Sequence, residues 1–275
     1  MAAANPKPDV VVDTDWIAAR LGDPAVRLIE MDVNSKAYEQ GHLPGSVLWN
    51  AYTDLRDATY RLVGRADLER LLSRSGIAPE STVVVYGYSA PLGFWLLRTY
   101  GHRDVRILAV SRNRWTEAGN AWTTNVSEPS ETSCVLSAPS SDTLASRQDV
   151  ESAIGDPRYL VLDVRSREEY IGERFWPSGA TEDTGRSGHV PGAVHVPIDS
   201  LRREDGTLKD PDALRAVFEA AGVDDTKTVI TYCTIGNRAS QAWFALKYVL
   251  GYPDVRVYYG SWVEWGKAPD SPIES

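Results

Sequence analysis

Cys233 ends a β-branched run, Thr228–Tyr232, and a short loop that contains Gly236 and Arg238 follows it. A helix-forming stretch begins near Ala239, so we expect the thiol between the carboxyl end of a strand and the amino end of a helix. The partial positive charge of that helix end and the guanidinium of Arg238 both favour thiolate over thiol. Because the thiolate is the nucleophile, this spacing suits covalent catalysis through sulfur. The alternative is a buried cysteine that acts as a small apolar residue.

Composition and charge narrow the class of protein. The chain has 275 residues, 43% of them hydrophobic, which is enough for two domains of ordinary size. Its two cysteines lie far apart in sequence, which argues against a disulfide framework and for a reducing compartment. We find neither a secretory signal pattern at the amino terminus nor a run of about 20 apolar residues. Acidic residues outnumber basic ones by 38 to 29. We therefore predict a cytoplasmic protein without a nucleic-acid or membrane partner.

The chain contains one pattern twice. A Gly-His-Leu-Pro-Gly motif at Gly41–Gly45 recurs as Gly-His-Val-Pro-Gly at Gly188–Gly192, and a tyrosine precedes each. Further along, Val83–Gly87 matches Val229–Cys233. Because the matching elements recur in the same order, we interpret them as a duplication. Repeats of this length exceed a solenoid unit and indicate two whole domains.

We therefore predict an α/β fold with two tandem domains, 1–124 and 146–275, joined by a Ser-, Pro- and Thr-rich linker at 125–145. Short apolar strands alternate with amphipathic helices, which predicts in each domain a mostly parallel sheet with helices on both faces. In the second domain we expect strands near 159–163, 193–196, 229–232 and 255–258, and helices near 146–153, 211–221 and 239–250. In the first domain we expect helices near 66–75 and 92–100. Cys134 lies in the linker without a neighbouring base or glycine turn, and we expect no function for it.

The two copies differ where the chemistry is expected. Gly87 stands where the second copy has Cys233, and the path from Gly87 to Gly101 is four residues shorter than the path from Cys233 to Gly251. We predict one active site, in the second domain, with the first domain as a scaffold and a wall of the pocket. The second copy also has an insertion at 171–187. It could form the rim of the site or an ordinary surface loop, and the sequence favours neither.

Together these motifs resemble the tandem-domain rhodanese family, the thiosulfate and 3-mercaptopyruvate sulfurtransferases. The resemblance rests on both Gly-His motifs, on Asp163-Val164-Arg165, on the Cys233 loop and on the closing run Gly260–Gly266. It implies two rhodanese-like domains, an inactive first and a catalytic second, in which Cys233 cycles between thiolate and persulfide. No metal or organic cofactor is implied. The expected partners are a small anionic sulfur donor and an acceptor that is a thiol or cyanide. The Cys-x-x-Gly-x-Arg loop favours thiosulfate as the donor, with 3-mercaptopyruvate as the alternative.

Substrate contacts are expected from the loop and from one further arginine. Main-chain amides of the loop can surround the negative charge of a persulfide. Arg238 can hold the anionic oxygens of the donor, unless it is an arginine that points into solvent at the start of a helix. By the resemblance Arg165 also binds the anion, and the alternative is an ion pair with Asp163. The predicted substrate-binding residues are Thr234, Ile235, Gly236, Asn237, Arg238 and Arg165.

Two other functions compete with sulfur transfer by a free-standing enzyme. Cysteine phosphatases share a related fold, but the loop between their cysteine and arginine is one residue longer than the Thr234–Asn237 segment here. A non-enzymatic or partner-dependent persulfide carrier would keep Cys233 and turn over small acceptors poorly. The sequence leaves open the physiological donor and acceptor.

Overall fold

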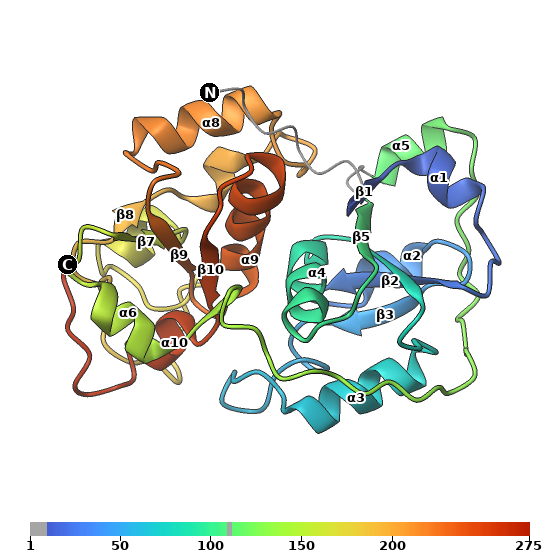
Figure 1. The fold of residues 1–275 in the computed structure, drawn as a ribbon, viewed down its shortest axis with the longest axis horizontal. Helices are drawn as coiled ribbons and strands as arrows, with labels where there is room; N and C mark the ends of the chain where they lie inside the picture. The colour runs from blue at the N-terminus through green and yellow to red at the C-terminus, as the bar shows by residue number, and fades with distance from the viewer. Residues whose placement is uncertain (1–9, 109–111) are drawn as a thin grey trace. The chain divides into compact units, whose positions relative to one another are not determined.

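The computed structural model describes residues 10–108 and 112–275, and the chain divides by its internal contacts into two units, with the division between Pro139 and Ser140. Within the described residues each unit holds a five-stranded sheet (Figure 1). The strand orders are β1-β5-β4-β2-β3 and β6-β10-β9-β7-β8, and every pair of neighbouring strands is parallel. The prediction of an α/β fold with two tandem domains of one type is confirmed.

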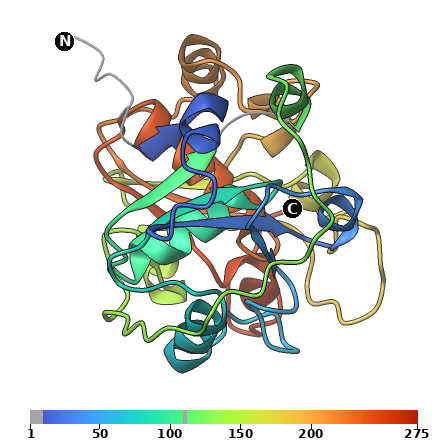
Figure 2. The same cartoon turned by 90° about the vertical axis from the view of Figure 1, so that its right-hand side faces the viewer.

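In the first domain the elements alternate as expected. Figure 2 shows its helices, blue to green, around its strands. The strands are β1 (Val11–Val12), β2 (Val26–Asp32), β3 (Val47–Asn50), β4 (Thr82–Tyr86) and β5 (Val105–Leu108). The helices are α1 (Thr14–Ala18), α2 (Lys36–Gln40), α3 (Arg65–Arg74), α4 (Ala90–Thr99) and α5 (Arg112–Glu117).

The second domain repeats this order. Its strands are β6 (Leu144–Ala145), β7 (Tyr159–Asp163), β8 (Val194–His195), β9 (Thr228–Tyr232) and β10 (Val255–Tyr258). Its helices are α6 (Arg147–Ala153), α7 (Arg167–Tyr170), α8 (Pro211–Ala220), α9 (Asn237–Phe244) and α10 (Ser261–Trp265), with a 3-10 turn η2 at Ile198–Leu201 and a π-helical turn at Ala245–Val249 after α9. The strands and longer helices predicted from the sequence end within about two residues of these bounds, except that the helix predicted near 239–250 is α9 continued by the π-helical turn.

Local sequence explains the main elements. The central strands β4 and β9 are almost entirely buried, as parallel strands covered on both faces should be. Helix α6 begins with a capping box, in which Ser146 and Asp149 each satisfy the other's backbone N–H. Helix α8 begins with Asp210 as its cap and Pro211 in the first turn, where a missing N–H costs nothing. The two-residue edge strands β1 and β6 are too short to show a period and were not predicted.

The predicted linker lies against the first domain. Thr132 exchanges hydrogen bonds with Ser73 of α3, since its N–H donates to the Ser73 carbonyl and its own carbonyl accepts from Ser73 Oγ. The amide of Leu136 donates to Glu69 of the same helix. The contacts within the chain separate the two domains between Pro139 and Ser140, inside the predicted linker. The predicted domain limits at 124 and 146 therefore stay predictions.

The strand registers show which positions of the two domains correspond. Glu30 of β2 pairs with Tyr86 of β4, and Asp163 of β7 pairs with Tyr232 of β9. Glu30 and Asp163 therefore occupy the same place in the two sheets. Among the helices of the described residues, we find none long and apolar enough to cross a membrane.

Candidate active site

Cys233 directly follows β9, and helix α9 begins four residues later at Asn237. The thiol therefore lies between a strand end and a helix start, and its Sγ accepts the backbone N–H of Gly236 over 3.0 Å. Gly236 has φ +90°, and a Cβ there would lie 2.8 Å from the ring of Tyr259, so this turn requires glycine. One of the predicted loop amides thus contacts the sulfur. Ile235 and Asn237 are buried beside it.

The backbone of the cysteine is held by the start of α10. Cys233 donates its N–H to Ser261 Oγ (3.2 Å), and its carbonyl accepts from the N–H of Trp262 (2.9 Å). The carbonyl of Thr234 accepts from the N–H of Val263 over 2.9 Å. Ser261 adopts φ +51°, a conformation that is uncommon for residues other than glycine and that tends to occur at functional sites. The sequence indicated this element only as a closing Gly-Ser-Trp run.

Arg238 is part of an internal ion pair. Its Nη1 and Nη2 donate to the two carboxylate oxygens of Glu169 over 2.7 and 2.8 Å, and Nη2 also donates to Thr234 Oγ1. The Arg238 side chain is 14% exposed and that of Glu169 is 0% exposed. Burial would raise the pKa of Glu169, but its hydrogen bonds with Arg238 and Thr234 and the Arg238 charge outweigh burial and lower that pKa. Glu169 is therefore a carboxylate at neutral pH.

Sequence reasoning missed Glu169. Its only signal was position, because it directly precedes Tyr170 of the repeated pattern, whereas Ala37 precedes the matching Tyr38.

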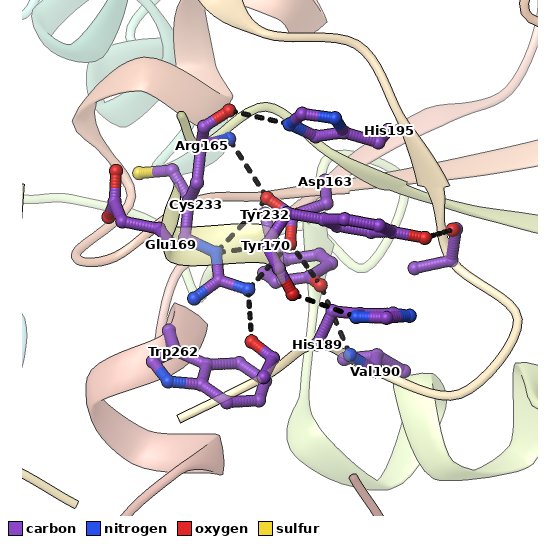
Figure 3. Close-up of polar contacts among 12 residues, drawn as sticks. Asp163, Arg165, Glu169, Tyr170, His189, Val190, His195, Tyr232, Cys233 and Trp262 are labelled. Atoms are coloured by element: carbon purple, nitrogen blue, oxygen red, sulfur yellow. Dashed lines mark hydrogen bonds and ion pairs between the residues drawn. The ribbon is translucent and has the colours of Figure 1, made fainter. Parts of the chain in front are cut away.

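Arg165 forms the internal pair that the sequence left as an alternative to substrate binding. Its Nε and Nη2 donate to Asp163, Nη2 also donates to the Gly188 carbonyl over 2.7 Å, and both charged side chains are fully buried (Figure 3). The guanidinium lies 4.3 Å from the ring centroid of Trp262, within the range of a cation–π contact. The hydroxyl of Tyr232 donates to Asp163 over 2.5 Å. The Nη1 of Arg165 is buried without a hydrogen-bond partner among the described residues.

An aromatic stack supports the chain between Arg165 and the Gly-His motif. The ring of Tyr170 lies between those of His189 and His195, with centroid distances of 3.8 and 4.4 Å (Figure 3). A ring nitrogen of His195 pairs with the carbonyl of Arg165 over 2.9 Å. A ring nitrogen of His189 pairs in the same way with the carbonyl of Tyr170 over 2.9 Å, so both histidines are tied to the backbone and have a structural role.

The insertion 171–187 packs against the second domain at its ends and is exposed in its middle. Its ends pack: Phe175 is buried, and the Arg186 carbonyl accepts the indole N–H of Trp262 over 3.1 Å. Its middle, 177–184, is exposed. The insertion thus supports the tryptophan that covers Arg165.

Cys134 differs from Cys233 in its surroundings. It is buried, and burial together with the charges of Glu69 and Glu80 raises the pKa of its thiol, which favours the unreactive protonated form. Across residues 10–108 and 112–275 no cluster of three or more His, Cys, Asp or Glu side chains is arranged to hold a metal ion.

Comparison with known proteins identifies the family. The Rhodanese-like domain family matches residues 13–118 and 146–268. The chain is 38% identical to a "Putative thiosulfate sulfurtransferase" of Haloferax volcanii, over 97% of this chain and 96% of the relative. It is also 38% identical to the "Sulfur carrier protein TtuD" of Thermus thermophilus, with the same coverage.

Solved structures have the same fold. The crystal structure of the anaerobic ergothioneine biosynthesis enzyme from Chlorobium limicola superposes with a TM-score of 0.87 at 24% identity, over 97% of this chain and 70% of that one. A variant of EanB, solved in complex with ergothioneine covalently linked with a cysteine persulfide, gives a TM-score of 0.86 at 25% identity, over 96% of this chain and 70% of that one. The two family matches cover most of the chain, and the relatives cover nearly all of it. The chain therefore belongs to the rhodanese family of sulfurtransferases and carries two of its domains in tandem.

Proposed function

We propose that this protein moves the outer sulfur of thiosulfate to a thiophilic acceptor, cyanide or a thiol, through a persulfide on Cys233. The observation that carries the proposal is the hydrogen bond from the Gly236 N–H to Cys233 Sγ at the amino end of α9. A main-chain donor and a helix end at the sulfur favour its anionic form both before and after it takes up a second sulfur. The names of the relatives support the same reaction class.

The reaction is balanced without a cofactor. The Cys233 thiolate attacks the outer sulfur of thiosulfate, a bond forms between the two sulfurs, and the sulfur–sulfur bond of the donor breaks to release sulfite with its electron pair. The acceptor then attacks the outer sulfur of the persulfide, and the thiolate leaves. Two half-reactions on one enzyme group give ping-pong kinetics. The EanB complex named above offers a precedent for a persulfide in this fold.

The predicted substrate contacts divide by their surroundings. The loop from Thr234 to Asn237 offers main-chain donors, and Gly236 already contacts the sulfur. Arg165 is bound to Asp163 and fully buried, and Arg238 is bound to Glu169. We therefore propose the loop amides as the anion contacts, with Arg238 acting through the shape of the loop.

Two assays test this function. Intact-mass measurement after treatment with thiosulfate should show a gain of one sulfur atom that is absent in Cys233→Ser. Thiocyanate should then form on addition of cyanide. A protein that gains no sulfur, or that hydrolyses phosphate esters instead, would overturn the proposal. Catalytic efficiencies for thiosulfate and 3-mercaptopyruvate, measured side by side, decide the donor.

The thiol must also be reachable. Cys233 is buried, so iodoacetamide labelling of the native protein, in a Cys134→Ala background, tests whether small reagents reach it. Rapid labelling, slowed by thiosulfate, is expected. A thiol that reacts only after unfolding would rule out catalysis at Cys233. A cytoplasmic location, whose reducing conditions suit a thiolate cycle, stays a prediction from cysteine usage.

A partner-dependent sulfur carrier is the second candidate, and the similarity to the "Sulfur carrier protein TtuD" favours it. In that case the persulfide forms as above, but turnover with cyanide is slow and rises when the protein that accepts the sulfur is added. The presence of the persulfide together with poor cyanide turnover would select this candidate over the free-standing enzyme.

A further inference from the structure

Glu169 has a hydrogen-bond pattern that a structural carboxylate at a helix start does not need. It belongs to the capping box of α7, in which its Oε2 accepts the N–H of Ser166. Yet Oε2 also accepts from Arg238, and Oε1 accepts from both Arg238 and Thr234. A cap uses one of these contacts. The other three tie Glu169 to the loop that carries Cys233.

These contacts decide what the loop offers to an anion. The two-pronged pair with Glu169 neutralises the charge of Arg238 inside the protein. Thr234 Oγ1 accepts from Arg238, so its own hydrogen points to Glu169. The side chains of Thr234 and Arg238 are thus both engaged with one carboxylate. Charge on a donor is left to main-chain N–H groups of the loop.

The first domain serves as an internal control. There Arg112 donates to Glu30 and to the Gly41 carbonyl, and its guanidinium lies 4.1 Å from the Trp122 ring centroid. The second domain has the same set of contacts, in which Arg165 donates to Asp163 and to the Gly188 carbonyl and lies over a tryptophan. An acid–arginine brace with a buried acid therefore exists with or without a cysteine and belongs to the fold.

The contacts of Glu169 with Thr234 and Arg238 occur only in the domain that has the cysteine, among the described residues. In the first domain Ala37 occupies the position before the matching tyrosine, Gly87 replaces Cys233, and the shorter loop has no counterpart of Arg238. The carboxylate, the arginine and the thiol are present together in one domain and missing together in the other. This association links Glu169 to the loop that carries the thiol and not to the brace that both domains share.

We propose that Glu169 is a positioning residue of sulfur transfer that fixes the shape of the Cys233 loop and cancels the charge of Arg238, so that main-chain amides recognise the donor. This inference rests on the function proposed above. Cancelling the charge has a use in the cycle: a free cation beside the sulfur would hold the persulfide and the dianionic donor too tightly. The ionisable groups near the network are Cys233, Asp163, Arg165 and Arg238 itself.

The main test is Glu169→Gln, which keeps the side-chain size and frees the charge of Arg238. We expect kcat with thiosulfate and cyanide to fall about 10- to 100-fold, the loss typical of misplaced reacting groups. KM for thiosulfate should fall at the same time, and more than KM for monoanionic 3-mercaptopyruvate, because the freed cation attracts the dianion more strongly. A merely structural role would lower activity without this split between the two donors.

A second readout does not depend on sulfur transfer. The rate of Cys233 alkylation by iodoacetamide, followed against pH in a Cys134→Ala background, should reach its half-maximum at lower pH in E169Q, since the freed cation favours the thiolate. Adding R238M, which removes the cation, should move the half-maximum back. If the wild type forms no persulfide, the proposed function fails, but this profile still tests Glu169.

The neighbouring Glu168→Gln is the matched control, because Glu168 is paired with Arg174 outside the loop. It should leave kcat, KM and the alkylation profile unchanged. If E169Q does not fold, Arg238→Lys replaces it: the charge stays but the two-pronged geometry is lost, and kcat should fall about tenfold. Wild-type kinetics in the folded variant, or lost activity with an unmoved KM ratio and profile, would overturn the proposal.

Discussion

The two domains share a sheet order and an acid–arginine brace whose acid is buried, yet each takes its arginine from a different element. In the second domain the arginine is Arg165, which follows β7. In the first domain Asp32 occupies the matching position at the end of β2, and the arginine of the brace is Arg112 of α5. The place of the guanidinium is thus kept while its source in the sequence changes. The guanidinium is needed at this place because it donates to the buried carbonyl of the first glycine in the Gly-His motif. Without the arginine, that carbonyl would lose a charged hydrogen-bond donor.

The domains differ in the loop after the central strand. Gly87 has φ +97°, and a Cβ there would lie 2.7 Å from the Met31 carbonyl, so the first domain has no room for a thiol at this position. In the second domain α10 holds the backbone of Cys233 instead. The first domain therefore has the same scaffold without a cysteine at this position and without the space for one.

The largest expected effect separates the two cysteines. Cys233→Ala should remove thiosulfate:cyanide activity entirely, because the nucleophile is gone, while Cys134→Ala should keep it. Far-ultraviolet circular dichroism of both variants should match the wild type. Measurable turnover in the Cys233 variant would place the chemistry elsewhere.

A matched pair of substitutions tests how much the acid–arginine brace stabilises each domain. Asp163→Asn leaves the fully buried Arg165 without its counter-ion and should cost about 3 kcal/mol of unfolding free energy. Glu30→Gln should cost less than about 1 kcal/mol, because the Arg112 side chain is 41% exposed and water can solvate it. Urea unfolding measures both. Equal costs would contradict the assignment of Arg112 as the more solvated partner.

A nucleophile should not be transferable to the first domain. Gly87→Cys places a side chain at a positive φ against the Met31 carbonyl and should destabilise the protein by about 1–3 kcal/mol. In a Cys233→Ser background the Gly87→Cys variant should form no persulfide, as intact mass after thiosulfate treatment will show. Uptake of one sulfur by this double variant would mean that the loop around the thiol matters less than we infer.

The smallest effect concerns pH, and the two domains should differ in sign. The pKa of Glu169 is lowered from 4.5, so its contribution to stability is present above that value and is lost as pH falls below it. The pKa of Glu30 is raised from 4.5, chiefly by burial, so its contribution is present below that value and is lost as pH rises. The unfolding free energy of the wild type relative to E169Q should therefore increase with pH, and that relative to E30Q should decrease. Parallel trends would refute the contrast.

Much of the fold could be predicted from local sequence. The strands β7 and β10 and helices such as α8 stand out because continuous apolar runs, caps and prolines act within a few residues. The duplication was visible because Gly-His motifs at positive-φ turns tolerate few other residues. Cys233 and its loop could be located for the same reason: a strand, a glycine and a helix start lie next to each other in the chain.

The partners of the charged residues were decided only by the tertiary structure. Arg238 and Glu169 are separated by 69 residues in sequence, and Ser261 is 28 residues from Cys233, so no local pattern predicts either contact. Sequence reasoning placed Arg238 either on the substrate or in solvent, and the fold pairs it with a carboxylate instead. Residue types and spacing determined that Cys233 lies between a strand end and a helix start, because both signals are local. Whether a charged side chain is free to bind a substrate depends on its partners from distant parts of the chain. Only the folded chain determines those partners.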